Sequence, residues 1–135
     1  MPVNKSTSNV VYFNNTKKPG GMRRIILAAG HSWRALKWLA TNEAAFRQEL
    51  LLLAGALIVL VAWDIPIQQK GLLLISVLFV MFAEIINTAI EVTIDRIGLE
   101  LHPMSGLAKD LASAAVMVAI AMAAVAWGTT VIAHI

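Results

Sequence analysis

Three long apolar segments dominate the chain, at about residues 44–63, 71–94 and 111–133. A transmembrane helix needs roughly 20 mostly apolar residues. The first segment reaches this length only if the turn carrying Arg47, Gln48 and Glu49 lies in the membrane interface. Pro66 ends this segment, because proline disfavours helix in the residue before it. The pattern predicts three membrane-spanning helices, with a short turn at 64–70 and a loop at 96–110.

A different pattern precedes the first apolar segment. Between Gly20-Gly21 and the first span, at about residues 22–41, a helical projection separates two faces. The apolar face holds Ile25, Ala29, Trp33, Leu36 and Ala40, and the basic face holds Arg23, Arg24, His31, Arg34 and Lys37. This pattern is typical of an amphipathic helix lying on a membrane surface. Residues 1–21 are rich in Asn, Ser, Thr and Lys and are predicted to be a disordered tail.

Composition supports a membrane protein. The chain has 135 residues, of which 59% are hydrophobic, whereas soluble domains are about 45–50% apolar. A soluble chain this short has too little interior to bury so much apolar surface. Eight of the eleven Lys and Arg residues precede Leu50. Cytoplasmic flanks carry such an excess, so the N-terminus is predicted to face the cytoplasm. No nucleic-acid partner is expected, because the remainder of the chain is membrane-embedded.

Polar side chains recur along the second apolar segment. Spacings of three, four and four residues place Glu84, Asn87, Glu91 and Asp95 on one helical stripe. An ionisable residue at the bilayer centre costs about 2.5–3.5 kcal/mol on insertion scales. The stripe therefore needs partners, water or a cation. Three interpretations remain open at this point: hydrogen-bonding between helices, a catalytic or metal site, and an ion or proton path.

Topology brings other polar residues to the same depth. Glu43 begins the first span, and Lys109, Asp110 and Ser113 begin the third. Glu43 and Glu91 are able to share a hard cation, since Mg²⁺ favours one or two carboxylates plus substrate phosphates. Taken alone, Lys109 and Asp110 also fit an ion pair at a helix start. Taken alone, Arg24, His31 and His102 also fit contacts at the membrane interface.

The common nucleotide-binding and hydrolase motifs are absent. The chain has no G-x-x-x-x-G-K-[ST], G-x-G-x-x-G, G-x-S-x-G or H-E-x-x-H sequence. Residue patterns alone therefore indicate a small polytopic membrane protein with an acidic site, without revealing its reaction.

Three motifs resemble those of the prokaryotic diacylglycerol kinases. They are NEAAFRQE at 42–49, EIINTAIE at 84–91 followed by Asp95-Arg96, and SGLAKD at 105–110. The resemblance runs from about Arg23 to the C-terminus. It implies an all-α homotrimer of three-helix subunits with shared active sites, in the bacterial inner membrane. It also implies the phosphorylation of 1,2-diacylglycerol to phosphatidate by MgATP at the cytoplasmic side, in phospholipid metabolism and diacylglycerol recycling.

The resemblance also implies roles for individual residues. Glu84 and Asn87 correspond to the catalytic positions, with Glu84 as the base on the lipid hydroxyl, and Glu43 and Glu91 to the Mg²⁺ ligands. The expected ATP contacts are Arg24, His31, Glu43, Glu91, Glu100, His102, Lys109 and Asp110. The expected lipid contacts are Arg24, Ala29, Ser32, Trp33, Ala45, Arg47, Gln48, Glu49, Glu84 and Ser113. Related enzymes phosphorylate undecaprenol, which is the alternative substrate. A small membrane transporter or a structural subunit is the competing function from another class.

Overall fold

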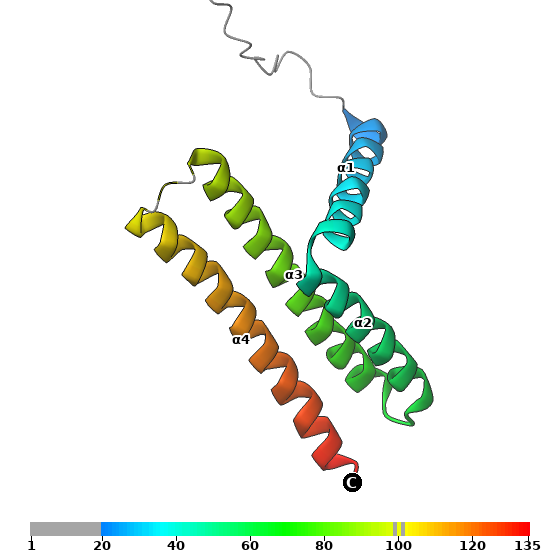
Figure 1. Ribbon diagram of the computed structural model, residues 1–135. Helices are drawn as coiled ribbons and strands as arrows, with labels where there is room; N and C mark the ends of the chain where they lie inside the picture. The colour runs from blue at the N-terminus through cyan, green and yellow to red at the C-terminus, as the bar shows by residue number, and fades with distance from the viewer. Residues whose placement is uncertain (1–19, 99, 101) are drawn as a thin grey trace, which may run out of the picture. The chain divides into compact units, whose positions relative to one another are not determined.

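The protein is described here by a computed structural model that covers residues 20–98, 100 and 102–135. These residues form four helices: α1 (Gly21–Asn42), α2 (Ala44–Ala62), α3 (Ile67–Ile97) and α4 (Pro103–Ala133) (Figure 1). The predicted all-α class is confirmed. Residues 1–19 of the predicted disordered tail lie outside the described residues.

The chain divides into two compact units, Met1–Ala35 and Leu36–Ile135. The boundary falls inside α1, so the described part of the first unit is the beginning of that helix. The second unit holds the end of α1 and all three long helices. That α1 lies on a membrane surface stays a prediction.

Side chains close the junction between α1 and α2. The last carbonyls of a helix have no partner within it. Here Thr41 Oγ1 donates to the Trp38 carbonyl at 2.9 Å, and Asn42 Nδ2 donates to the same carbonyl at 2.8 Å. Arg47 Nη1 donates to the Thr41 carbonyl at 3.3 Å. Glu43 is the single residue between the two helices, and its side chain makes no capping hydrogen bond.

The connection between α3 and α4 is shorter than predicted. The loop was expected at 96–110, with Pro103 and Gly106 as turn signals, but α4 already begins at Pro103. Proline is favoured at the first position of a helix, because its missing N–H has no partner there. His102 caps this end: its Nδ1 accepts from the Met104 N–H at 3.2 Å. The expected turn at 64–70 is likewise shorter, since α3 starts at Ile67.

The lengths of the helices position the polar residues. Helices α2, α3 and α4 have 19, 31 and 31 residues and are long and apolar enough to cross a membrane. At 1.5 Å per residue, 31 residues extend about 46 Å, whereas the hydrocarbon layer is about 30 Å thick. Helices α3 and α4 are therefore longer than the hydrocarbon layer is thick, and Glu91, Asp95 and Lys109 lie near the ends of these helices that adjoin their connecting loop.

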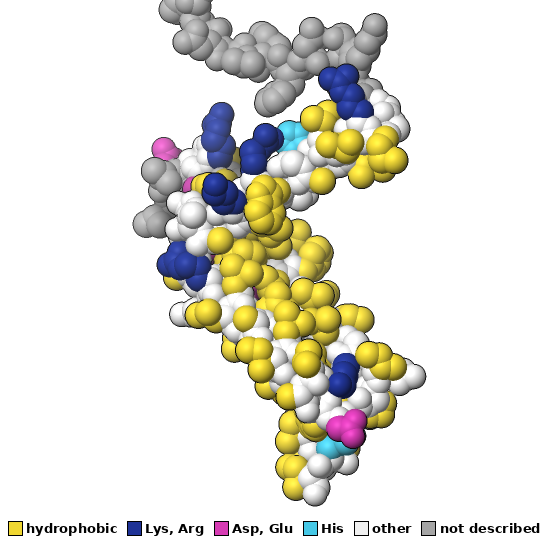
Figure 2. All heavy atoms as spheres, turned by 90° about the vertical axis from the view of Figure 1, so that its right-hand side faces the viewer, with side chains coloured by type: hydrophobic (Ala, Val, Ile, Leu, Met, Phe, Trp, Pro, Cys, Tyr) yellow, Lys and Arg dark blue, Asp and Glu magenta, His cyan; other side chains and the backbone are white. Residues whose placement is uncertain are grey.

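Helix α3 packs against both α2 and α4. One cluster of buried side chains contains Leu39, Phe46 and Met81, and a second contains Leu60, Ile65 and Leu73. On α4, the small residues Ala112 and Ala119 are buried and allow close approach. The small residues Ser113 and Ala115 on the same helix are exposed in the single chain. Hydrophobic side chains cover most of the visible flank of the helices (Figure 2), as expected of surfaces that face lipid or other subunits.

Replacing Leu73 by alanine tests the packing of α3. Leu73 is completely buried, whereas its neighbour Leu72 is 58% exposed. A leucine side chain is surrounded by hydrocarbon both in the packed protein and in helices that have separated within the membrane. The loss of stability on replacing Leu73 therefore comes mainly from the cavity that the smaller side chain leaves. We expect Leu73→Ala to lower the unfolding free energy by about 1–2 kcal/mol. Thermal unfolding in micelles measures this loss. Leu72→Ala is the matched control, and equal loss in both variants would contradict the packing.

Candidate active site

The part of the predicted polar stripe that carries Glu84 and Asn87 is buried between helices, whereas Glu91 is half-buried and Asp95 is exposed. Glu84 is 8% exposed, Asn87 is 9% exposed, and Thr88 beside them is 5% exposed. Ionisable residues in membrane helices almost always face the interior of a bundle or a water-filled cavity. The burial of Glu84 therefore agrees with a functional position rather than contact with lipid.

Carboxylates from three elements gather around Glu84. Glu91 from the same helix and Glu43 from the α1–α2 junction lie within electrostatic reach of Glu84. Glu49 of α2, which is 8% exposed, also lies within electrostatic reach of Glu84. Like charges repel one another more strongly where water is scarce than they do in water. The arrangement therefore favours occupation by a cation or a proton.

Asn87 orients one of these carboxylates. Its Nδ2 donates to Glu91 Oε1 at 3.0 Å, and its Oδ1 is buried without a hydrogen-bond partner in the described structure. Nowhere in residues 20–98, 100 and 102–135 do three or more His, Cys, Asp or Glu side chains gather in a group able to hold a metal. Glu43 and Glu91 still fit Mg²⁺, because this ion is commonly held by one or two carboxylates with substrate phosphates completing its shell.

A polar pocket of about 580 Å³ lies where α3 leads into α4. Three of the predicted ATP contacts, Glu100, His102 and Lys109, line it together. Asp110 is exposed and is not among the described side chains that line the pocket. The other residues that line the pocket are Ile94, Asp95, Gly98, Pro103, Ser105 and Gly106.

The stripe and the pocket are continuous along α3. Asp95 lines the pocket, and Glu91 lies one turn below it on the same stripe. From Asp95 to Glu84 the helix rises about 16 Å. A ligand with one end in the pocket and the other near Glu84 would pass Glu91.

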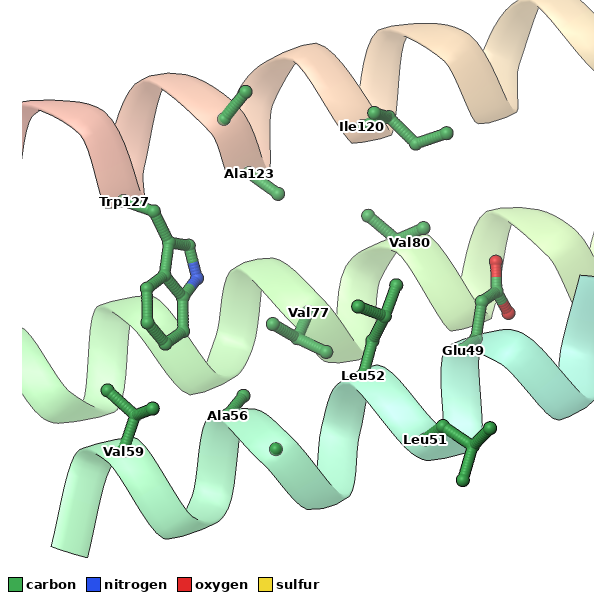
Figure 3. Close-up of a pocket in the computed structure, with 12 residues that line it drawn as sticks. Glu49, Leu51, Leu52, Ala56, Val59, Val77, Val80, Ile120, Ala123 and Trp127 are labelled. Carbon is green, nitrogen blue, oxygen red and sulfur yellow. The ribbon is translucent and has the colours of Figure 1, made fainter. Parts of the chain in front are cut away.

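An apolar groove of about 460 Å³ runs between α2, α3 and α4. Glu49 lies at one end and Trp127 at the other, with Val77, Val80 and Ala123 between them (Figure 3). Glu49 Oε2 and Trp127 Nε1 are buried, and neither has a hydrogen-bond partner in the described structure. Three other predicted lipid contacts on α2, Ala45, Arg47 and Gln48, are exposed near the Glu49 end of this helix.

Five predicted site residues lie in the first compact unit. They are Arg24, Ala29, His31, Ser32 and Trp33, all on α1. Within this unit, the Arg34 guanidinium is hydrogen-bonded to His31 Nδ1. The contacts predicted between these five residues and ATP or lipid stay predictions.

Comparison with known proteins identifies the family. The family model described as prokaryotic diacylglycerol kinase matches residues 30–131. The chain belongs to the prokaryotic diacylglycerol kinase family. A relative from Escherichia coli, named diacylglycerol kinase, is 47% identical over 114 residues, which cover 84% of this chain and 91% of the relative. One of the same name from Pseudomonas aeruginosa is 38% identical over 109 residues, covering 81% and 89%. One from Helicobacter pylori is 31% identical over 121 residues, covering 90% and 94%.

Membership of the prokaryotic diacylglycerol kinase family confirms the resemblance and makes the chain a phosphotransferase enzyme. The structure also points to residues to which the sequence assigned no role. Asp95 was placed on the stripe but given no task, although it lines the pocket and pairs with Lys109. The spacing of Asp95 from Glu84, which puts both on one face of the helix, is the sequence feature that could have indicated a role for Asp95. Nothing in the sequence pattern indicated Trp127.

Proposed function

We propose that this chain transfers the γ-phosphoryl group of MgATP to the hydroxyl of 1,2-diacylglycerol, giving phosphatidate and ADP. The observation that carries the proposal is that Glu91, one turn of α3 below a pocket lined by Lys109, lies together with Glu43 within electrostatic reach of buried Glu84. Phosphoryl transfer depends mainly on positioning and charge neutralisation. Lys109 and a cation held by the carboxylates would supply both of these where the pocket meets the stripe.

The reaction follows from the positions along α3. The nucleotide occupies the polar pocket, where Glu100, His102 and Lys109 contact it, and its γ-phosphate extends toward Glu91. The lipid hydroxyl lies at Glu84. Its oxygen bonds to the γ-phosphorus, the bond from this phosphorus to the ADP oxygen breaks, and the hydroxyl proton passes to the Glu84 carboxylate. Glu84 suits the role of proton acceptor because a carboxylate positioned beside the reacting hydroxyl can act as a general base.

Glu43 and Glu91 would hold Mg²⁺ beside the phosphates. When bound, the ion neutralises charge on the phosphate oxygens. Glu43 suits this role because its carboxylate is not used to cap α2. Asn87 acts as a positioning residue: its hydrogen bond to Glu91 Oε1 leaves the second carboxylate oxygen of Glu91 for the cation.

The apolar groove suits one acyl chain of the lipid substrate. It begins at Glu49, within electrostatic reach of Glu84, so a hydroxyl at Glu84 brings an attached acyl chain to the groove. Small side chains hollow it out, and a Cβ added at Gly55 would meet nothing within 4 Å. The apolar side chains that line the groove suit the hydrocarbon of an acyl chain. Arg47, Gln48 and Ser113 would lie near the level of the lipid headgroup.

We also propose that the enzyme works as a homotrimer in the bacterial inner membrane, with its N-terminus and active site on the cytoplasmic side. The excess of Lys and Arg before Leu50 supports this orientation. The trimer rests on the resemblance alone. Neighbouring subunits would enclose the site.

Glu84→Gln tests the reaction most simply. The change keeps the shape of the side chain but removes the proton acceptor, so phosphatidate formation should fall by a factor of about 10²–10⁴. The assay uses purified protein in lipid micelles with MgATP and diacylglycerol, and size-exclusion chromatography checks that the oligomer persists. Asp64→Asn, which neutralises a carboxylate at the opposite end of α2, should leave the rate unchanged.

A fully active Glu84→Gln variant would remove Glu84 from the chemistry. Undecaprenol in a parallel assay decides between the two lipid substrates of the family. Ion flux without ATP and without a phosphorylated lipid would instead favour a transporter.

Ala123→Leu tests the acyl-chain groove. Ala123 points into the groove (Figure 3), so a leucine there would fill part of it. We expect KM for dioleoylglycerol to rise by about tenfold, while dioctanoylglycerol, with shorter chains, is affected less. Ala121→Leu, on α4 but outside the groove, is the matched control. If both substrates respond equally to Ala123→Leu, the acyl chain lies elsewhere; if the oligomer dissociates instead, a second copy of the chain covers the groove.

A further inference from the structure

Lys109 is already paired in the structure. Its Nζ lies 2.6 Å from Asp95 Oδ1, in the one ion pair formed by the described part of the chain. The pair joins α3 to α4 across the loop that connects them. An ion pair between Lys109 and its neighbour Asp110, which the sequence also allowed, does not form, since adjacent residues on a helix do not face each other.

Both members of the pair line the polar pocket. The cation that would meet a nucleotide phosphate is therefore neutralised by a carboxylate of the same pocket. The side chains of Lys109 and Asp95 are 37% and 50% exposed, so water and ligands reach both. A phosphate entering the pocket has to draw the ammonium away from Asp95 or share it with Asp95.

The exchange is energetically feasible. An exposed ion pair contributes at most a factor of about five to an equilibrium constant. Lys109 has three N–H donors and a flexible stem, so its ammonium can move to a phosphate oxygen. Asp95 then remains near the phosphate as an unpaired like charge. Both effects oppose nucleotide binding, and both act equally on ATP and ADP.

We propose that Asp95 competes with the nucleotide for Lys109, neutralising the ammonium in the empty pocket and weakening the binding of MgATP and MgADP alike. This inference rests on the proposed function, because it takes Lys109 to be a phosphate contact. Asp95 is a positioning residue rather than a catalytic one. Its effect is to help the product ADP leave, since a site that holds ADP tightly turns over slowly.

Asp95→Asn tests the competition directly. The change preserves the side-chain shape and frees Lys109, so the dissociation constant of MgADP should fall by a factor of about two to five. Isothermal titration of the full-length protein in lipid micelles measures this constant. KM for MgATP should fall by the same factor. Adenosine, which lacks phosphate, should bind equally to both proteins. If Asp95→Asn does not fold, Asp95→Ser removes the same charge.

Two further variants show whether the effect passes through Lys109. Asp95→Glu keeps the charge and should bind MgADP with wild-type affinity. In a Lys109→Ala background, most of the gain from Asp95→Asn should disappear, because there is no ammonium to release. An equal gain in both backgrounds would overturn the proposal, because Asp95 would then act only by repelling phosphate. Weaker MgADP binding by Asp95→Asn would overturn it as well.

The failure of this inference differs from the failure of the proposed function. If the wild-type protein neither binds MgADP nor forms phosphatidate, the kinase proposal itself is wrong. If the wild-type protein does both, and Asp95→Asn binds MgADP no more tightly, only the competition is wrong.

Discussion

The burial of ionisable side chains between membrane helices is the constraint on which the rest of the structure depends. Glu84 and Glu49 each occupy packed positions where water is scarce and where hydrocarbon offers no hydrogen bonds. Such groups destabilise a membrane protein unless a proton, a cation or a polar partner compensates them. In the proposed reaction, the compensation required for folding and the charge required for phosphoryl transfer coincide around Glu84.

Helix length and helix ends determine where the polar residues of the proposed site lie. Helices α3 and α4 are longer than the hydrocarbon layer is thick, and Glu91, Asp95 and Lys109 lie near the ends of these helices that adjoin the connecting loop. Pro103 and His102 begin α4 immediately after a short loop, which holds these ends side by side. In the proposed reaction, the nucleotide enters the pocket at the start of α4, while the lipid substrate remains at the level of Glu84.

Periodicity predicted the parts of the site that lie on one helix. The spacing of Glu84, Asn87 and Glu91 was sufficient to place them on one face, and hydropathy was sufficient for the three spans. The start of α4 was predicted wrongly, because Pro103 and Gly106 favour turns as well as helix starts, and local propensity does not decide between these uses. The pairing of Lys109 with Asp95 depends on how two helices pack, which no local pattern contains.

The measurement that tests the central claim most directly uses Mn²⁺ in place of Mg²⁺, with a non-hydrolysable ATP analogue and protein labelled with ¹³C at the glutamate carboxyl carbons. Electron–nuclear double resonance then detects carboxylates bonded to the ion. The claim that Glu43 and Glu91 hold the cation beside Glu84 predicts ¹³C couplings that weaken in Glu43→Gln and in Glu91→Gln but persist in Glu49→Gln. Couplings that are absent from the wild-type protein, or unchanged in both of the first two variants, would contradict it.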